Sequence, residues 1–215
     1  MINVSIVEDD RAVRELLADC IGRAEGFHCL SQYADAGSAM GQLPADNPGV
    51  VLMDINLPDA TGIECVRQLK PLMPETHFLM LTVYEDSHHI FDALESGAVG
   101  YLLKPTPGDK LIASLRQICD GGAPMTSYIA RKVVESFRQT PPPSAATQTL
   151  SARENEVLGL LARGYYHKEI ADQLGVKITT VTTYVSRIYE KLHVHSRARA
   201  VAKLNGIRDS HRPAK

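Results

Sequence analysis

Charged and hydroxyl side chains directly follow four short apolar runs in the first half of the chain. In chain order these residues are Glu8, Asp9, Asp10, Asp54, Thr82 and Lys104. Clustered carboxylates repel one another, and Mg²⁺ relieves this repulsion because it binds a few carboxylates together with water and phosphate oxygens. An aspartate in such a cluster can attack phosphorus and become an aspartyl phosphate. These residue types favour phosphoryl transfer to Asp54, with Thr82 and Lys104 holding the phosphoryl oxygens.

The apolar runs indicate how these side chains come together. They cover residues 4–7, 50–53, 78–81 and 101–103, with a weaker run near 29–33. Apolar residues at helical spacing follow the first run, at Val13, Leu16, Leu17, Cys20 and Ile21, as expected for an amphipathic helix. Buried strands alternating with helices are typical of a parallel sheet covered on both faces, which binds ligands beyond the carboxyl ends of its strands. The sequence therefore predicts a doubly wound α/β domain with a parallel five-stranded sheet.

A linker and a change in charge divide the chain. Residues 139–149 read QTPPPSAATQT, a composition that favours extended backbone over a packed core. Residues 1–120 hold 8 basic and 18 acidic side chains, a net charge of −10, whereas residues 150–215 hold 12 basic and 6 acidic, a net charge of +6. This asymmetry suggests two domains with different partners, and the basic half is the one suited to phosphates. We expect domains over 1–122 and 150–208, a helix and Pro-rich linker over 123–149, and a polar tail over 209–215.

The second half has the pattern of a small all-α four-helix domain. Ser151 and Glu154 form a capping-box pattern, and Gly175 separates two later helices, the second expected over about 179–193. Helix, glycine-containing turn and helix is the helix-turn-helix pattern, whose second helix enters the major groove of DNA. Hydroxyl groups and threonine methyls read base edges, whereas cationic side chains bind phosphates. The candidate DNA contacts are Thr179, Thr182, Thr183 and Ser186 for bases, and Lys168, Arg187 and Lys191 for phosphates.

Several other classes of protein and site do not fit the sequence. No apolar stretch approaches the roughly 18 residues of a membrane span, and the first ten residues lack the order of a secretory signal. We therefore expect a cytoplasmic protein with no membrane contact. The four cysteines form no CxxC pair and are expected to be buried thiols. His88 and His89 lack i, i+4 spacing, so we expect them to be surface residues with no metal role.

The acidic half closely resembles the receiver domain of bacterial two-component response regulators. The resemblance covers about residues 1–120 and rests on IVEDD (6–10), VLMDINLPDATGIE (51–64), LMLT (79–82) and GYLLKP (100–105). It implies that a sensor histidine kinase phosphorylates Asp54. It also implies a Mg²⁺ site made by the carboxylates of Glu8, Asp9 and Asp54 and by the backbone carbonyl of Asn56.

The same resemblance assigns a pair of switch residues. Two positions of this sequence depart from the family pattern. Thr82 and Tyr101 match the coupled switch pair, in which the hydroxyl moves toward the phosphoryl group and the ring turns inward, and the peptide before Pro105 is expected to be cis. Glu8 stands where many receivers have aspartate, which predicts a slightly shifted metal. Val83 stands where receivers often have a small residue, and we predict that it narrows access to Asp54 for small phosphodonors.

Residues 150–201 resemble the LuxR-type DNA-binding domain. Together with the receiver they resemble a NarL/FixJ-type response regulator. This resemblance implies a homodimer that binds repeated sites in promoter DNA, a dimer contact near residues 196–204, and RNA polymerase as a further candidate partner. Two positions depart from the family pattern. Lys177 stands where a capping Ser or Thr is usual, so Thr179 could cap the recognition helix instead. Thr182 stands where the family often has lysine.

Three functional classes are consistent with these residues. The favoured class is a phosphorylation-controlled, DNA-binding transcription regulator that performs no catalysis beyond its own phosphorylation. An atypical regulator or helical interaction protein that works without phosphorylation is an alternative, and the intact acidic set argues against it. An aspartyl-phosphate phosphatase fits least, because such enzymes need a second aspartate two positions after the nucleophile, and this chain has Asn56 there.

Overall fold

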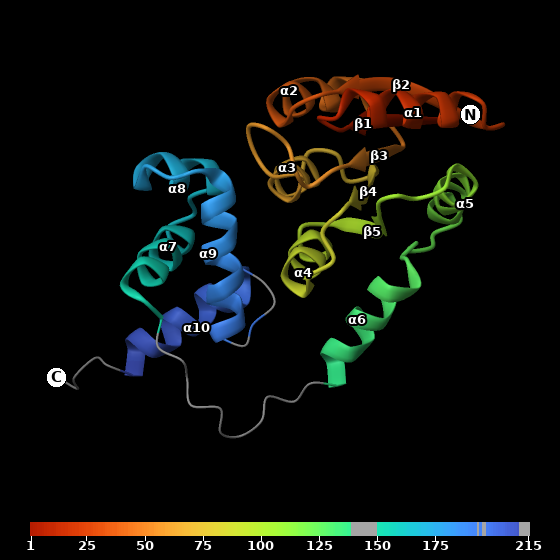
Figure 1. The fold of residues 1–215 in the computed structure, drawn as a ribbon. Coiled ribbons are helices and arrows are strands. Elements are labelled where there is room, and N and C mark those ends of the chain that lie inside the picture. Colours follow the sequence, from red (N-terminus) through yellow and green to blue (C-terminus); the bar gives the residue numbers. More distant parts are fainter. Residues whose placement is uncertain (139–149, 193, 195–196, 211–215) are drawn as a thin grey trace. The chain divides into compact units, whose positions relative to one another are not determined.

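The computed structural model describes residues 1–138, 150–192, 194 and 197–210. The chain divides into two compact units, Met1–Glu135 and Ser136–Lys215. Figure 1 labels the helices and strands of both. No helix in the described ranges is both long enough and apolar enough to cross a membrane.

The first unit contains a five-stranded parallel sheet, as predicted. Its strands are β1 (Ile2–Val7), β2 (Phe27–Tyr33), β3 (Val50–Met53), β4 (His77–Thr82) and β5 (Ala98–Leu103), in the order β2-β1-β3-β4-β5. All neighbouring strands pair in parallel, with Val7 opposite both Tyr33 and Met53. The carboxyl ends of β1 and β3 therefore lie side by side, and the residues that follow them meet at one edge.

Helices cover both faces of this sheet (Figure 1). They are α1 (Arg11–Gly22), α2 (Ala36–Asp46), α3 (Gly62–Leu69), α4 (Ser87–Glu95) and α5 (Gly108–Cys119). Apolar side chains of α1 and α5 pack on one face, and those of α2, α3 and α4 pack on the other. Alternate residues of β3 point to opposite sides, with Leu52 in the first of these cores and Met53 in the second. This is the doubly wound arrangement expected from buried parallel strands.

A sixth helix, α6 (Ser127–Arg138), begins in the first unit, which ends within it at Glu135. Ile129 is fully buried in the core beneath α2, α3 and α4, and Val133 packs beside it. The segment before α6 also pairs with β5, because the Tyr101 amide donates to the Pro124 carbonyl at 2.9 Å. The compact unit thus includes residues 123–135, and the receiver boundary at residue 122 stays a prediction.

The second unit is helical. Its elements are α7 (Ala152–Ala162), α8 (His167–Leu174), α9 (Ile178–Lys191) and α10 (Arg197–Ser210). The predicted capping box is present: the Glu154 amide donates to the Ser151 hydroxyl at 3.2 Å and the Ser151 amide donates to the Glu154 carboxylate at 2.6 Å. Gly175 ends α8 in the left-handed conformation, with φ of 64°, so it makes the tight turn before α9.

Two predictions about local structure are wrong. The recognition helix α9 begins at Ile178, after Lys177 in an extended cap conformation without a side-chain cap bond. Thr179 therefore lies inside the helix and does not cap it. The cysteines are all free, but Cys65 alone is buried and Cys119 is exposed, so the expectation of four buried thiols holds for one of them.

Candidate functional site

Asp54 is held at the carboxyl end of β3 by backbone contacts. Its amide donates to the Val7 carbonyl at 2.9 Å, which continues the pairing of β3 with β1 beyond the last strand residue. One carboxylate oxygen, Oδ1, accepts a hydrogen bond from the Ile55 amide at 2.6 Å. The residue is only 6% exposed, so its carboxylate has a defined position next to the sheet.

Glycine at position 62 permits the backbone around Asp54. A β-carbon added to Gly62 would lie 1.8 Å from the Asp54 carbonyl oxygen and 2.8 Å from its carbonyl carbon. The Gly62 amide also donates to the Ile55 carbonyl at 2.9 Å. The first residue of α3 therefore touches the main chain of Asp54, and no side chain fits between them.

Two further carboxylates lie close to Asp54. The ligand oxygens of Glu8, Asp9 and Asp54 are all within 4.8 Å of one another. Burial raises the pKa of Glu8, although its hydrogen bond with Lys104 opposes the shift. Three carboxylates on adjacent strand ends are the donor set that a hard divalent cation binds, so the residues present fit a Mg²⁺ ion.

Lys104 connects two of these carboxylates. It follows β5, and its Nζ donates to Asp54 Oδ2 at 2.8 Å and also to Glu8 Oε2. Burial lowers the pKa of Lys104, but the hydrogen bonds with Asp54 and Glu8 outweigh it and raise the pKa overall. The ammonium is thus a permanent positive charge beside Asp54. The peptide between Lys104 and Pro105 is cis, as expected.

Thr82 at the end of β4 carries a polar atom with an unused bonding capacity. Thr82 is fully buried, and its Oγ1 has no hydrogen-bond partner within the described part of the chain. A buried hydroxyl without a partner loses the bonds that it would make in water. An oxygen-rich group bound at Asp54 would supply such a partner.

Tyr101 is already inside the protein. Its ring is fully buried, and its hydroxyl donates to the Tyr84 carbonyl at 2.8 Å. Burial raises its pKa well above the usual range, so the hydroxyl stays protonated and acts as a donor here. The inward position expected after phosphorylation is therefore present in this structure.

The other predicted residues of this edge are exposed. Val83 directly follows Thr82 and is 66% exposed. Asn56 is exposed in the loop after β3 and forms an antiparallel bridge with Thr61. The access role of Val83 and the metal contact of Asn56 stay predictions.

Asp59 positions the loop that follows Asp54, a role that the sequence motifs did not predict. Its two carboxylate oxygens accept hydrogen bonds from the Ala36 and Gly37 amides, both at 2.8 Å. These amides open α2, where a carboxylate is favoured by the helix dipole. Asp59 therefore ties the loop after Asp54 to α2. The sequence signal for this role is the place of Asp59 in the PDATG segment, but the amides that it binds lie more than 20 residues away in the chain.

The candidate DNA contacts lie on or near α9 with different exposures. Thr179, Thr183 and Arg187 are exposed on α9 and Lys168 is exposed on α8, whereas Thr182 and Ser186 are half-buried. The hydroxyls of Thr182, Thr183 and Ser186 each donate to the carbonyl four residues earlier, at 3.2, 3.0 and 3.0 Å. The threonine hydroxyl oxygens can still accept hydrogen bonds, and the threonine methyls remain for apolar contact.

Lys191 differs from the other candidates because it has a partner inside the unit. Its Nζ donates to Glu154 Oε2 at 2.7 Å, which joins the end of α9 to the capping box of α7. This hydrogen bond is the largest cause that lowers the pKa of Glu154. Lys191 thus has a structural contact, and its predicted phosphate contact stays untested.

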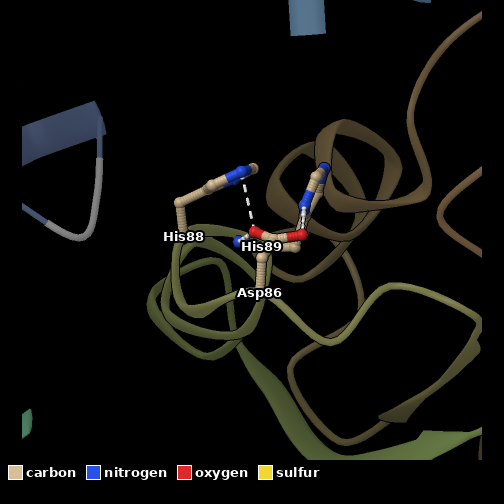
Figure 2. Close-up of side chains that lie close together, drawn as sticks. All are labelled: Asp86, His88 and His89. Atoms are coloured by element: carbon tan, nitrogen blue, oxygen red, sulfur yellow. Dashed lines mark hydrogen bonds and ion pairs between the residues drawn. The ribbon is translucent and has the colours of Figure 1, made fainter. Parts of the chain in front are cut away.

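The expected surface position is wrong for His89, and His88 is half-buried, whereas the expected lack of a metal role stays a prediction. His89 is buried, and its Nδ1 lies 2.6 Å from Asp86 Oδ2, while His88 Nε2 lies 2.7 Å from Asp86 Oδ1 (Figure 2). The three residues form a group whose ligand atoms could hold a metal ion. The i, i+4 criterion missed this group because its third member is an aspartate that precedes the helix.

A parallel sheet with an aspartate cluster at its carboxyl edge, followed by a helix-turn-helix unit, defines a class of proteins that join a phospho-acceptor domain to a DNA-binding domain. The family described as response regulator receiver domain matches residues 4–116, and the luxR family of bacterial regulatory proteins matches residues 148–204. The chain therefore belongs to the response regulators that carry a receiver and a LuxR-type helix-turn-helix.

Known relatives agree with this assignment. The chain is 30% identical over 213 residues to the DNA-binding transcriptional activator DevR/DosR of Mycobacterium tuberculosis, covering 99% of this chain and 98% of that protein. It is 32% identical over 211 residues to the uncharacterized transcriptional regulatory protein YxjL of Bacillus subtilis, covering 96% and 97%. A crystal structure of a LuxR-family two-component response regulator from an Aurantimonas species superposes with a TM-score of 0.60 at 29% identity, covering 65% of this chain and 99% of that one.

The family excludes one of the functional classes considered above. The protein is a DNA-binding transcriptional response regulator of two-component systems, and it is not a conventional enzyme. The phosphatase alternative is therefore wrong.

Proposed function

We propose that Asp54 accepts a phosphoryl group from a phosphohistidine of a sensor histidine kinase. An Asp54 carboxylate oxygen forms the new bond to phosphorus while the bond from phosphorus to the kinase imidazole nitrogen breaks, and the electron pair stays on that nitrogen. The observation that carries the proposal is the convergence of the Asp54 carboxylate, the Lys104 ammonium and the Thr82 hydroxyl, which has no partner among the described residues, at one sheet edge.

Each neighbour has a role that follows from its chemistry. Lys104 keeps its charge and balances the added negative charge of the phosphoryl group. Thr82 donates its hydroxyl hydrogen to a phosphoryl oxygen, which satisfies a group that is otherwise buried without a partner. The Ile55 amide holds Asp54 Oδ1, so the carboxylate does not rotate freely.

Mg²⁺ is the cofactor that this donor set supports. It would be held by Glu8, Asp9, Asp54 and the backbone carbonyl of Asn56, and when bound it offsets the repulsion between the carboxylates and an incoming phosphoryl group. The support is the 4.8 Å grouping of the three carboxylates.

The output we propose is phosphorylation-dependent binding to promoter DNA as a homodimer, with transcription controlled through RNA polymerase. The net charge of +6 over residues 150–215 and the exposed face of α9 support DNA contact by this unit. Thr82 ends β4 and Tyr101 lies within the neighbouring strand β5, and the two residues are proposed to relay the phosphorylated state. The cytoplasmic location stays part of this proposal.

Phosphate incorporation tests the proposal. The full chain is incubated with Mg²⁺ and a small phosphodonor, and the added mass is located by peptide analysis. We expect one phosphoryl group on the wild type, none on Asp54→Asn, and normal incorporation on Asp109→Asn, a matched exposed aspartate outside the site. Equal incorporation into Asp54→Asn would refute Asp54 as the acceptor and would favour a regulator that works without its phosphorylation.

A further inference from the structure

We propose that Asp86, His88 and His89 form a second metal site, distinct from the Asp54 cluster, that binds Zn²⁺ or a similar divalent transition-metal cation. The three residues lie where the segment after β4 enters α4. Their ligand atoms fall within 4.8 Å of one another. Figure 2 shows the two imidazole rings on either side of the Asp86 carboxylate, with one ring nitrogen of each directed at it.

The local fold holds this arrangement in place. Asp86 is the N-cap of α4, and its Oδ1 accepts a hydrogen bond from the His89 amide at 3.2 Å. The first turn of α4 then places both histidines beside the cap, with ring centroids 4.0 Å apart. The His89 ring also packs on Tyr84, with centroids 4.5 Å apart. The ligand positions are therefore set by a helix cap and by packing.

The ligand types decide which cation fits. Two imidazoles and one carboxylate suit Zn²⁺ and its neighbours, whereas Mg²⁺ prefers oxygen ligands and keeps much of its water. The positive end of the α4 dipole opposes any cation at this place. Binding must then come from direct ligation, which favours a cation with high affinity for imidazole. Three protein ligands leave further coordination positions for water.

The protonation states already suit metal ligation. Burial lowers the pKa of His89, so this ring is neutral at neutral pH. Burial alone would raise the pKa of Asp86, but hydrogen bonds from both histidines outweigh it and lower the pKa far below its usual range. A neutral imidazole needs only to carry its proton on the nitrogen that faces away from the ion. The His89 ring would change tautomer as the ion replaces its hydrogen bond to Asp86.

The position of the site links it to the receiver switch. The two residues before Asp86 provide carbonyls that hold other elements: Tyr84 accepts the Tyr101 hydroxyl at 2.8 Å, and Glu85 accepts Lys132 of α6 at 2.9 Å. A cation bound to Asp86 and α4 would fix the end of this same segment. The site is therefore placed to restrain the connection between Thr82 and α4.

Zn²⁺ titration of the full chain, with Mg²⁺ in excess, tests the proposal. We expect the wild type to bind one Zn²⁺ that Mg²⁺ does not displace. Loss of an outer partner of a metal ligand commonly weakens binding about tenfold to a hundredfold, so loss of a ligand by His88→Gln or Asp86→Asn should weaken it at least tenfold. His28→Gln, at an exposed histidine outside the group, should bind as the wild type does.

Two further variants keep the outcome interpretable. Asp54→Asn should retain this Zn²⁺ equivalent, because the site does not depend on phosphorylation. Co²⁺ bound in place of Zn²⁺ should give d–d absorption without thiolate charge transfer, since the group contains no cysteine. The proposal is overturned if His88→Gln and Asp86→Asn bind Zn²⁺ as tightly as the wild type, or if the equivalent is lost in Asp54→Asn.

Discussion

Thr82 carries the buried hydroxyl that most directly predicts a bound oxygen ligand. A buried donor without a partner costs about 1–3 kcal/mol, and valine has nearly the same shape without the hydroxyl. Thr82→Val should therefore raise the free energy of unfolding of the unphosphorylated protein by about 1 kcal/mol. The same change should lower the extent of Asp54 phosphorylation, because a donor to the phosphoryl group is lost. Urea unfolding and phosphate incorporation measure the two effects.

Thr82→Ser is the matched control for this pair of measurements. It keeps the hydroxyl and should retain most of the phosphorylation. The role assigned to the hydroxyl would be contradicted if the Thr82→Val protein were less stable than the wild type and Asp54 were still phosphorylated to the normal extent.

Gly62 offers a second test at the scale of one residue. A β-carbon there would meet the Asp54 main chain at 1.8 Å and the Met53 side chain at 2.9 Å. Gly62→Ala must shift Asp54, so we expect a loss of roughly 1–3 kcal/mol in unfolding free energy and a marked drop in phosphorylation. Gly41→Ala on α2 has open space around the new carbon and should instead stabilise by up to about 1 kcal/mol. Equal phosphorylation of Gly62→Ala and Gly41→Ala would contradict the close contact between Gly62 and Asp54.

The side chains that gather at the strand ends could be predicted from the sequence, because their position depends only on which residues follow the apolar runs that form buried strands. Asp54 and Lys104 met as expected for that reason. The roles of Gly62 and Asp59 depend on contacts between distant backbone segments, which no local pattern contains. The Asp86 group was missed because its ligands come from both a cap and a helix turn.

At the scale of elements, the capping box of α7 and the end of α9 share one ion pair. The hydrogen bond from Lys191 lowers the pKa of Glu154, helped by the bonds with Ser151. A carboxylate whose folded pKa is depressed stabilises the fold above its unfolded pKa and loses this effect as pH falls through the folded value. Glu154→Gln should therefore lower the unfolding free energy of the helical unit by roughly 1–3 kcal/mol at pH 7.

The difference between the two proteins should shrink as pH falls below the ordinary glutamate pKa. Denaturant unfolding of the full chain, followed at several acidic pH values, measures this. A stability difference that stays constant down to the most acidic pH would contradict the assigned ion pair.

The recognition helix gives a second prediction about an element. Thr182 is half-buried on α9, and a lysine at this position is expected to reach a DNA phosphate. Thr182→Lys should steepen the dependence of log affinity on log salt by about one unit. Gln42→Lys, on the exposed surface of the receiver helix α2, adds the same charge elsewhere and should leave the slope unchanged. An unchanged slope for Thr182→Lys would mean that this position does not face the DNA.

The strands were predictable as elements, and the start of β3 was too, but the starts of β1 and β5 were not. β5 begins at Ala98 and contains Gly100, small residues that an apolar run does not include, yet they pair with β4. β1 likewise begins at Ile2, before the predicted run. α9 begins at Ile178, shortly after the turn at Gly175, even though Lys177 at its N-cap makes no side-chain cap bond.

At the scale of the whole molecule, charge separates the two functions. The acidic receiver suits a metal and a phosphoryl group, and the basic second half suits DNA. A phosphoryl group on Asp54 can control DNA binding only if the phosphorylated and unphosphorylated forms differ in affinity. Coupling between distant sites is commonly about 5-fold to 150-fold in affinity, which defines the size of the expected effect.

The affinity of the full chain for DNA fragments selected from its own genome tests this coupling most directly. Affinity is measured for the wild type and for Asp54→Asn, each with and without a phosphodonor and Mg²⁺, at one salt concentration. We predict that phosphorylation strengthens binding by the wild type at least about fivefold and leaves Asp54→Asn unchanged. Equal affinity of Asp54→Asn and the phosphorylated wild type would contradict control of DNA binding through Asp54.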